Sequence, residues 1–321
     1  MILTLTPNPS IDATMQLGTR LRRGLVHRPS AISQVAGGKG VNVTHALTLA
    51  DKLSLALFPA DSNDPFVALA RRAGIPFHSI PVSGGVRINT TLTEPDGTTT
   101  KINGLGAEIE PPTRRIIEET VVRLAANASW LVMAGSLPPG VPTGWYTELI
   151  SAVRGTHPDL PIAVDTSDAA MIALGEGFGV AAPTLIKPNG LELGQLVDRD
   201  GEHLEQAAAE GDFAPVVEAA RIVVERGVRE VLVTLGAAGG VLVTRDGVWH
   251  ATPPPVDVMS TVGAGDSSLA GYLMARAEGA GPADCLARAI AYGTAATGLP
   301  GTTIPSPTQL NLEETHVRHL S

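Results

Sequence analysis

The sequence has few of the features that disulfide-rich, nucleic-acid-binding or membrane proteins need. Its 321 residues hold one cysteine, Cys285, so no disulfide can form within the chain, and we expect a protein of the reducing cytoplasm. Aromatic residues make up only 3%, so the core must be largely aliphatic. The net charge of −9 and the lack of basic runs argue against a nucleic-acid or membrane partner. No apolar run is long enough to span a bilayer, and no charged leader precedes the first apolar run.

What the sequence does contain is an alternation of short apolar runs and amphipathic segments. Residues 2–6, 130–134, 162–164 and 231–235 are typical of buried strands, and segments such as 113–127 between them are typical of helices. Strands separated by helices predict right-handed crossovers and a mostly parallel, Rossmann-like sheet flanked by helices. No linker or repeat divides the chain, so we expect one α/β domain over residues 1–321.

Two segments differ from this pattern. Residues 86–93 and 98–103 are threonine-rich and alternating, and the turn between them contains Pro-Asp-Gly, which predicts a hairpin. We expect residues 84–104 and about 10–35 to form a small β-sheet lid over one end of the main sheet. For the tail, we expect a short helix near residues 310–320.

The most informative stretch is residues 260–270, S-T-V-G-A-G-D-S-S-L-A. Gly263-Ala264-Gly265 lets backbone N–H groups approach a ligand, and the helix that follows offers unsatisfied donors to an anion. Asp266 then has two interpretations. It is a carboxylate that caps the helix, or it is a base for a hydroxyl beside a phosphoryl-binding hole.

Other polar groups also follow predicted strands, and the carboxyl ends of parallel strands share one edge of a sheet. They are Asp12, Gly135-Ser136, Asp165, Lys187-Pro188-Asn189 and residues 236–239. Together they could supply a phosphoryl-transfer site, with Asn189 and Glu192 on magnesium and residues 234–239 on a nucleotide. Simpler interpretations remain. Asn189 and Glu192 fit a helix cap with a solvated glutamate, and residues 234–239 fit a plain turn. Asp12 fits a turn aspartate, and Arg87 fits a surface arginine.

Four motifs occur in order: Gly37-Gly38-Lys39-Gly40-x-Asn42, Lys187-Pro188-Asn189-x-x-Glu192, Thr234-Leu235-Gly236-x-x-Gly239, and residues 260–266. This set resembles the signatures of the ribokinase-like PfkB sugar kinases. Residues 6–12 and Arg87-Ile88-Asn89 are similar to the 1-phosphofructokinase and tagatose-6-phosphate kinase branch. The resemblance spans residues 2 to about 300.

The resemblance implies a ribokinase-like fold with a small β lid, often used for dimerisation, and we expect a homodimer formed through it. It also implies ATP as phosphoryl donor, Mg²⁺ and a sugar-phosphate substrate. The implied roles are these: Asp266 as catalytic base, with Gly263, Ala264 and Gly265 as the anion hole; Asp12, Gly38, Lys39, Asn42, Arg87, Asn89 and Ser136 at the sugar phosphate, with Lys39 and Arg87 facing its existing phosphate; Lys187, Thr234, Leu235, Gly236, Ala237, Ala238, Gly239 and Gly265 at the nucleotide; and Asn189 and Glu192 at magnesium, through water.

The function expected is phosphorylation of fructose 1-phosphate to fructose 1,6-bisphosphate, with tagatose 6-phosphate or fructose 6-phosphate as alternative substrates. A non-catalytic sugar-phosphate sensor is the alternative of a different class. An NAD-dependent enzyme is disfavoured because no G-x-G-x-x-G follows the first strand. Relatives that use a monovalent cation carry an aspartate six residues before the catalytic one, where this chain has Ser260. The resemblance therefore gives no support for a potassium requirement.

Overall fold

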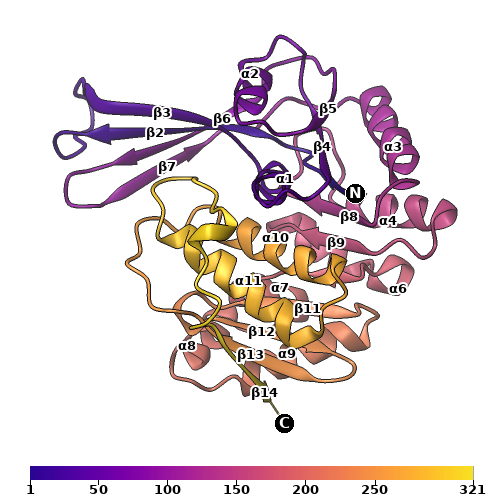
Figure 1. Ribbon diagram of the computed structural model, residues 1–321. Coiled ribbons are helices and arrows are strands. Elements are labelled where there is room, and N and C mark those ends of the chain that lie inside the picture. The colour runs from indigo at the N-terminus through magenta and orange to yellow at the C-terminus, as the bar shows by residue number, and fades with distance from the viewer. Residues whose placement is uncertain (321) are drawn as a thin grey trace.

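A computed structural model describes residues 1–320 of the chain. Its main feature is a large sheet with the strand order β14-β13-β12-β11-β10-β9-β8-β1-β4-β5 (Figure 1). The strands are β1 (Ile2–Leu5), β4 (Ser54–Pro59), β5 (Phe77–Ile80), β8 (Trp130–Ala134), β9 (Ile162–Asp165), β10 (Leu185–Ile186), β11 (Glu230–Thr234), β12 (Gly240–Thr244), β13 (Val248–Thr252) and β14 (His316–Leu320).

The part of this sheet from β11 to β5 is parallel, and β12, β13 and β14 extend it with antiparallel pairs. Strands β1, β8 and β9 are buried along their whole length. That burial explains why their sequences are continuous apolar runs, since helices cover both faces of a parallel sheet. The expected α/β architecture with a mostly parallel central sheet is confirmed.

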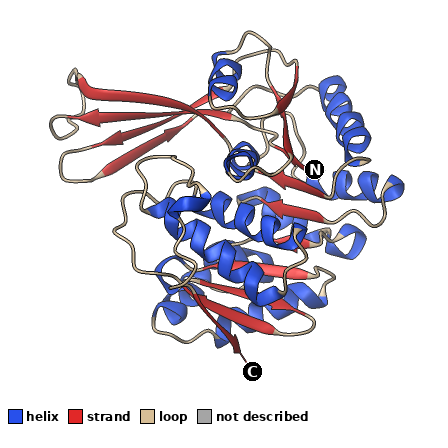
Figure 2. Ribbon diagram, in the orientation of Figure 1, coloured by secondary structure: helices blue, strands red, loops and turns tan. Residues whose placement is uncertain are grey.

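Helices cover both faces of the sheet (Figure 2). One apolar cluster joins side chains of α3, α4, α5, α7 and α9 to one face, and a second joins α1, α10 and α11 to the other. The helices are α1 (Lys39–Leu49), α2 (Pro65–Arg72), α3 (Pro111–Ala125), α4 (Trp145–Thr156), α5 (Asp168–Glu176), α6 (Phe178–Ala181), α7 (Gly190–Val197), α8 (Gly201–Ala209), α9 (Ala214–Glu225), α10 (Ala264–Ala277) and α11 (Pro282–Thr297), with 3₁₀ turns η1 (Gly236–Ala238) and η2 (Pro307–Gln309). Cys285 is buried in α11.

A second, four-stranded sheet has the order β3-β2-β6-β7. Its strands are β2 (Ser10–Leu17), β3 (Pro29–Gly37), β6 (Arg87–Thr93) and β7 (Thr99–Asn103), and β6 and β7 form the hairpin predicted around the Pro-Asp-Gly turn. Figure 1 shows this small sheet projecting from the body of the molecule. Most of β3 and β7 is exposed, unlike the strands of the large sheet.

The tail contradicts one expectation. Residues 316–320 form strand β14, paired antiparallel with β13, where a helix was expected. An isolated helix of that length is marginal in water, whereas pairing with β13 satisfies the edge of an existing sheet. Within residues 1–320, no helix is both long and apolar enough to cross a membrane.

Candidate active site

The polar groups that follow the strands of the large sheet line a single large cavity of about 1380 Å³. The expectation that they converge at one edge of the sheet is therefore confirmed. The cavity also reaches the small sheet, because side chains of β2 and β6 contribute to its wall. Predicted site residues on its lining are Asp12, Gly38, Lys39, Asn42, Arg87, Asn89, Ser136, Lys187, Asn189, Glu192, Thr234, Leu235, Gly236, Ala237, Gly239, Gly263, Ala264, Gly265 and Asp266.

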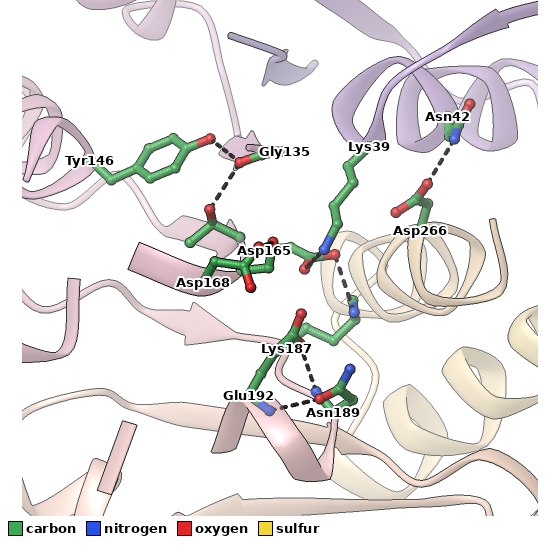
Figure 3. Close-up of polar contacts among 12 residues, drawn as sticks. Lys39, Asn42, Gly135, Tyr146, Asp165, Asp168, Lys187, Asn189, Glu192 and Asp266 are labelled. Atoms are coloured by element: carbon green, nitrogen blue, oxygen red, sulfur yellow. Dashed lines mark hydrogen bonds and ion pairs between the residues drawn. The ribbon is translucent and has the colours of Figure 1, made fainter. Parts of the chain in front are cut away.

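Asp266 lies in the first turn of α10, after Gly263, whose φ of 81° only glycine adopts readily. Its carboxylate does not cap the helix. Instead, Asn42 of α1 donates a hydrogen bond to Asp266 Oδ2 at 2.7 Å (Figure 3). Asp266 is buried, and burial, followed by repulsion from Asp165, raises the pKa of its carboxyl to about 6. A carboxylate with a raised pKa in a cavity is suited to accept a proton.

Asp165, the last residue of β9, is fully buried and forms ion pairs with two lysines. Lys39 Nζ lies 2.7 Å from Oδ1, and Lys187 Nζ lies 3.1 Å from Oδ2 (Figure 3). Burial works against both partners' charges, but the attraction is stronger: the pKa of Asp165 is lowered and the pKa of Lys39 is raised. The result is a pair of cations held beside the start of α10.

Packing against Lys187 explains why a glycine occupies position 265. A Cβ at this position would lie 3.0 Å from Lys187 Nζ, so any side chain would press on the lysine. The glycine lets the lysine approach the helix N-terminus, where the first backbone N–H groups have no partner within the helix. Lysine and helix terminus together make a site for an anion.

The wall beside Asp165 is fixed by a group of buried hydrogen bonds. Tyr146 Oη and Thr166 Oγ1 both donate to the Gly135 carbonyl, at 2.7 and 2.9 Å, and the Gly135 N–H donates to the Asp165 carbonyl at 2.9 Å. Figure 3 shows the hydrogen bond between Tyr146 and Gly135 in the same view as the two lysines. Ser136, which follows Gly135, is thereby set on the cavity wall.

Asn189 and Glu192 form a capping box at the start of α7, so Asn189 caps the helix as the simpler interpretation expected, but Glu192 is partly buried and not solvated. Asn189 Oδ1 accepts from the Glu192 N–H at 2.7 Å, and Glu192 Oε2 accepts from the Asn189 N–H at 2.9 Å. Burial, together with the nearby Asp165, raises the pKa of Glu192. Both residues also line the cavity, so a structural role does not remove them from the site.

The small sheet contributes a second polar group. Asp12 Oδ1 accepts from Ser10 Oγ at 2.7 Å and from Asn89 Nδ2 at 3.2 Å, which fixes its orientation. Burial raises the pKa of Asp12. Arg87 donates to the carbonyls of Asn8 and Gly104, at 3.1 and 3.4 Å. Within residues 1–320, Asn89 Oδ1 and Arg87 Nε are buried without a hydrogen-bond partner, one an acceptor and the other a donor.

Lys39 and Arg87 were expected to face the same phosphate. Both line the cavity, but Lys39 pairs with Asp165 of the large sheet, whereas Arg87 bonds to carbonyls near the small sheet. Ala238 is the one predicted nucleotide residue that is absent from the lining in the described chain; it packs against the core. Gly236 and Ala237 of the same turn are exposed to the cavity.

Sequence reasoning gave Asp165 a place at the sheet edge but no role, although it joins both lysines. It also missed cavity residues on helices: Glu205 and Gln206 of α8, and Ile290, Gly293, Thr294 and Thr297 of α11. The position of Asp165 after a buried run was a local signal. The helical residues reach the cavity through tertiary packing and carry no local pattern.

Comparisons with known proteins agree with this geometry. The model of the pfkB family of carbohydrate kinases matches residues 6–309. The chain belongs to this family. This chain is 35% identical over 320 residues to the 1-phosphofructokinase of Haloferax volcanii, and the match covers 99% of this chain and 97% of the relative. It is 31% identical to phosphofructokinase-2 from Escherichia coli, in a crystal structure with substrates and products, with a TM-score of 0.85 and 96% of each chain covered.

Ribokinase from Thermotoga maritima shares the fold, with a TM-score of 0.73, 18% identity and 98% of each chain covered. The ribokinase-like fold expected from the motifs is confirmed. As a pfkB kinase the protein is an enzyme, an ATP-dependent sugar kinase of carbohydrate metabolism. Family membership implies ATP as phosphoryl donor, generally with Mg²⁺, and a sugar phosphate as acceptor.

Proposed function

We propose that the protein transfers the γ-phosphoryl group of ATP to the 6-hydroxyl of fructose 1-phosphate, giving fructose 1,6-bisphosphate and ADP. The observation that supports this reaction is the position of Asp266, a buried carboxylate of raised pKa at a helix N-terminus. It lies beside two lysines that both form ion pairs with Asp165. The substrate follows the 1-phosphofructokinases to which the chain is 34–35% identical.

Asp266 acts as the base. Its Oδ2 accepts a hydrogen bond from Asn42, which leaves Oδ1 to take the proton of the sugar hydroxyl. As the proton leaves, the hydroxyl oxygen bonds to the γ-phosphorus and ADP departs. A sugar-phosphate sensor needs no proton acceptor, and burial of a carboxylate costs free energy. The arrangement therefore favours an enzyme over a sensor.

The transferred phosphoryl is stabilised at the start of α10. The backbone N–H groups of Ala264, Gly265 and Asp266 and the Lys187 ammonium form the anion hole, with donors fixed before the reaction. We assign Lys39 to the same phosphoryl group, because its ion pair with Asp165 holds it at this edge of the large sheet. Residues 234–239 line the nucleotide part of the cavity.

The small sheet recognises the sugar phosphate. Arg87 has a buried Nε without a partner, which matches an anionic acceptor such as the phosphate already on the substrate. Asp12 and Asn89 face sugar hydroxyls: the oriented carboxylate accepts from one, and the unpartnered Asn89 Oδ1 accepts from another. Gly38, Asn42 and Ser136 complete this part of the wall.

Asn189 and Glu192 fit magnesium held through water. No group of three or more histidine, cysteine, aspartate or glutamate side chains in residues 1–320 could hold a metal ion unaided. Mg²⁺ commonly keeps several waters and binds through one or two carboxylates and substrate phosphates, so a site with one carboxylate suits it. Since the capping box uses Glu192 Oε2, Oε1 is the oxygen left for a bound water. The cation would offset phosphate charge during transfer.

Ser260 accepts a hydrogen bond from the Val262 N–H and supplies no carboxylate, so this position gives no support for a monovalent-cation requirement. We also propose that two copies associate through the small sheet, which would act as a lid. Ile32, Ile88 and Ile102 on its strands are 49–59% exposed, and covering such side chains would be favourable.

A coupled assay of ADP release tests the substrate. It compares fructose 1-phosphate, tagatose 6-phosphate, fructose 6-phosphate and ribose under identical conditions. The highest kcat/KM is expected with fructose 1-phosphate. Turnover of ribose alone would overturn the phosphosugar assignment, since Arg87 would then have no anion to bind.

Fructose 6-phosphate is the second candidate. The observation that favours it is the fold match with TM-scores of 0.85 and 0.82 to phosphofructokinase-2 from Escherichia coli, one of whose structures is in complex with fructose 6-phosphate. The same assay separates the two, because a kinase for fructose 6-phosphate would show the higher kcat/KM with that substrate.

A further inference from the structure

His250 of β13 is a buried side chain that contacts residues 236–239, the predicted nucleotide loop, on the side facing the core. Its Nε2 lies 2.9 Å from the carbonyl oxygen of Ala238. Ala238 is the residue of the loop that does not line the cavity, while Gly236, Ala237 and Gly239 around it do. The histidine thus contacts the nucleotide wall from the side that faces the core.

The ring of His250 also packs against an aromatic neighbour. Its centroid lies 3.9 Å from that of Phe213, with 34° between the planes, and the Arg318 guanidinium lies 5.7 Å from the Phe213 centroid. Arg318 is the partner of His250 in the β13–β14 register. The strand that replaces the expected C-terminal helix therefore completes the packing around this histidine.

The hydrogen-bonding pattern fixes the tautomer. Nδ1 is buried and has no partner in the described chain, so a proton there would be an unsatisfied buried donor. Nε2 faces a carbonyl, which can only accept. The ring is therefore neutral with its proton on Nε2, and burial, which lowers the pKa of His250, is consistent with that state.

The loop is built from small residues and is closed by backbone hydrogen bonds, from the Leu235 N–H to the Gly239 carbonyl and from the Gly239 N–H to the Gly236 carbonyl. It is a three-residue 3₁₀ turn, Gly236–Ala238, followed by Gly239 at φ 86°, and it contains two glycines and two alanines. A Cβ on Gly239 would collide with the Ala251 carbonyl, so the turn lies directly on β13, the strand that carries His250. His250 adds a side-chain hydrogen bond to this turn from the side that faces the core.

We propose that His250 is a positioning residue for the nucleotide: by donating from Nε2 to the Ala238 carbonyl, it holds the 236–239 turn in the conformation that receives ATP. This inference rests on the proposed function, which places ATP at that turn. It predicts that loss of the donor weakens ATP binding and leaves sugar-phosphate binding unchanged.

The test measures binding of Mg·ATP and of fructose 1-phosphate, each alone, by calorimetry on the full-length chain. His250→Phe keeps an aromatic ring against Phe213 but removes the donor, and His250→Gln restores an N–H near the position of Nε2. His319→Phe is the matched control, because His319 is exposed on the neighbouring strand and packs on Trp249. Thermal unfolding of each variant is recorded.

For His250→Phe we expect about fivefold weaker Mg·ATP binding, the effect of one hydrogen bond. Binding of fructose 1-phosphate should be unchanged, and His250→Gln should recover most of the loss. His250→Phe that binds Mg·ATP as the wild type does, or equal losses for both ligands, would overturn the inference. A wild type that binds Mg·ATP with this histidine dependence but transfers no phosphoryl group would instead refute the proposed function and leave the inference standing.

Discussion

The two polar regions of the cavity are built in different ways. At the edge of the large sheet, Asp266, Asp165 and Lys187 are buried and each is engaged by another side chain. At the small sheet, Arg87 and Asn89 are only partly buried, and each has a buried polar atom without a partner. In the first region the charged side chains are already paired with one another or with Asn42, and donors fixed in advance are what stabilisation of a transition state requires. The second is incomplete, as recognition of a substrate requires. This difference supports the proposal that separate parts of the chain set the reaction and the choice of substrate.

The largest expected effect comes from the large sheet. Asp266→Asn should lower kcat by about 10³-fold, because the proton acceptor is lost while the positions of the other groups are kept. Binding of fructose 1-phosphate and of Mg·ATP, measured by calorimetry, should stay close to wild type. Asp257→Asn, an exposed acid nine residues earlier, is the control and should keep full activity. Wild-type kcat in Asp266→Asn would remove the base from the account.

Asp165→Asn is expected to rank second, with kcat about 10²-fold lower. The change leaves Lys39 and Lys187 without their shared counter-charge, so neither is held beside the start of α10. Steady-state kinetics measure the loss, and Asp159→Asn, in the exposed loop before β9, is the control. Unchanged kcat would mean that Lys39 and Lys187 do not depend on Asp165 to hold their positions.

Much of this division was predictable from the sequence, for physical reasons that differ between residues. Asp12, Asp165 and the 187–189 segment follow apolar runs, and strand ends must meet at one edge of a parallel sheet. The β6–β7 hairpin followed from its turn residues. Strand β14 could not be predicted, because a five-residue segment takes its structure from the strand it pairs with.

The partners of the site residues were also beyond the sequence. Nothing in the spacing shows that Asn42 bonds to Asp266, 224 residues away, or that Asp165 joins Lys39 to Lys187. The capping box of Asn189 and Glu192 is the opposite case, since its residues are three apart and form a local pattern. Sequence therefore predicts which groups line the cavity better than it predicts what each contacts.

In the small sheet, the largest effect is expected from Arg87. Arg87→Met should raise the KM for fructose 1-phosphate about tenfold and leave kcat and the KM for ATP within about twofold, because only substrate binding loses a charged hydrogen bond. Initial rates at saturating ATP measure this. Lys101→Met, which removes an exposed cation from β7 of the same sheet, should change neither constant. A fall in kcat with KM unchanged would place Arg87 in the chemistry instead.

The smallest expected effect is on stability. Because the pKa of Asp266 is raised to about 6, the folded protein binds this proton more tightly than the unfolded chain does, and the buried charge costs stability above that pH. At pH 8, Asp266→Asn should therefore raise Tm by a few degrees, since a shift of about two pKa units corresponds to at most roughly 3 kcal/mol. At pH 4, where Asp266 is protonated when folded, the gain should disappear. Differential scanning calorimetry at both pH values checks this.

The pH dependence of kcat/KM, compared between wild type and Asp165→Asn with the same substrates, tests whether Asp266 is the base. Titration of the substrates' phosphates is common to both enzymes, so a difference between the acid limbs reports an enzyme group. Asp165 repels negative charge on Asp266, whereas Lys39 and Lys187 attract it; Asp165 is the largest of these charge effects, so its loss should lower the pKa of Asp266. The account predicts an acid limb near pH 6 for the wild type and a limb at lower pH for the variant. Coincident limbs would contradict the assignment of Asp266 as the base within this buried cluster.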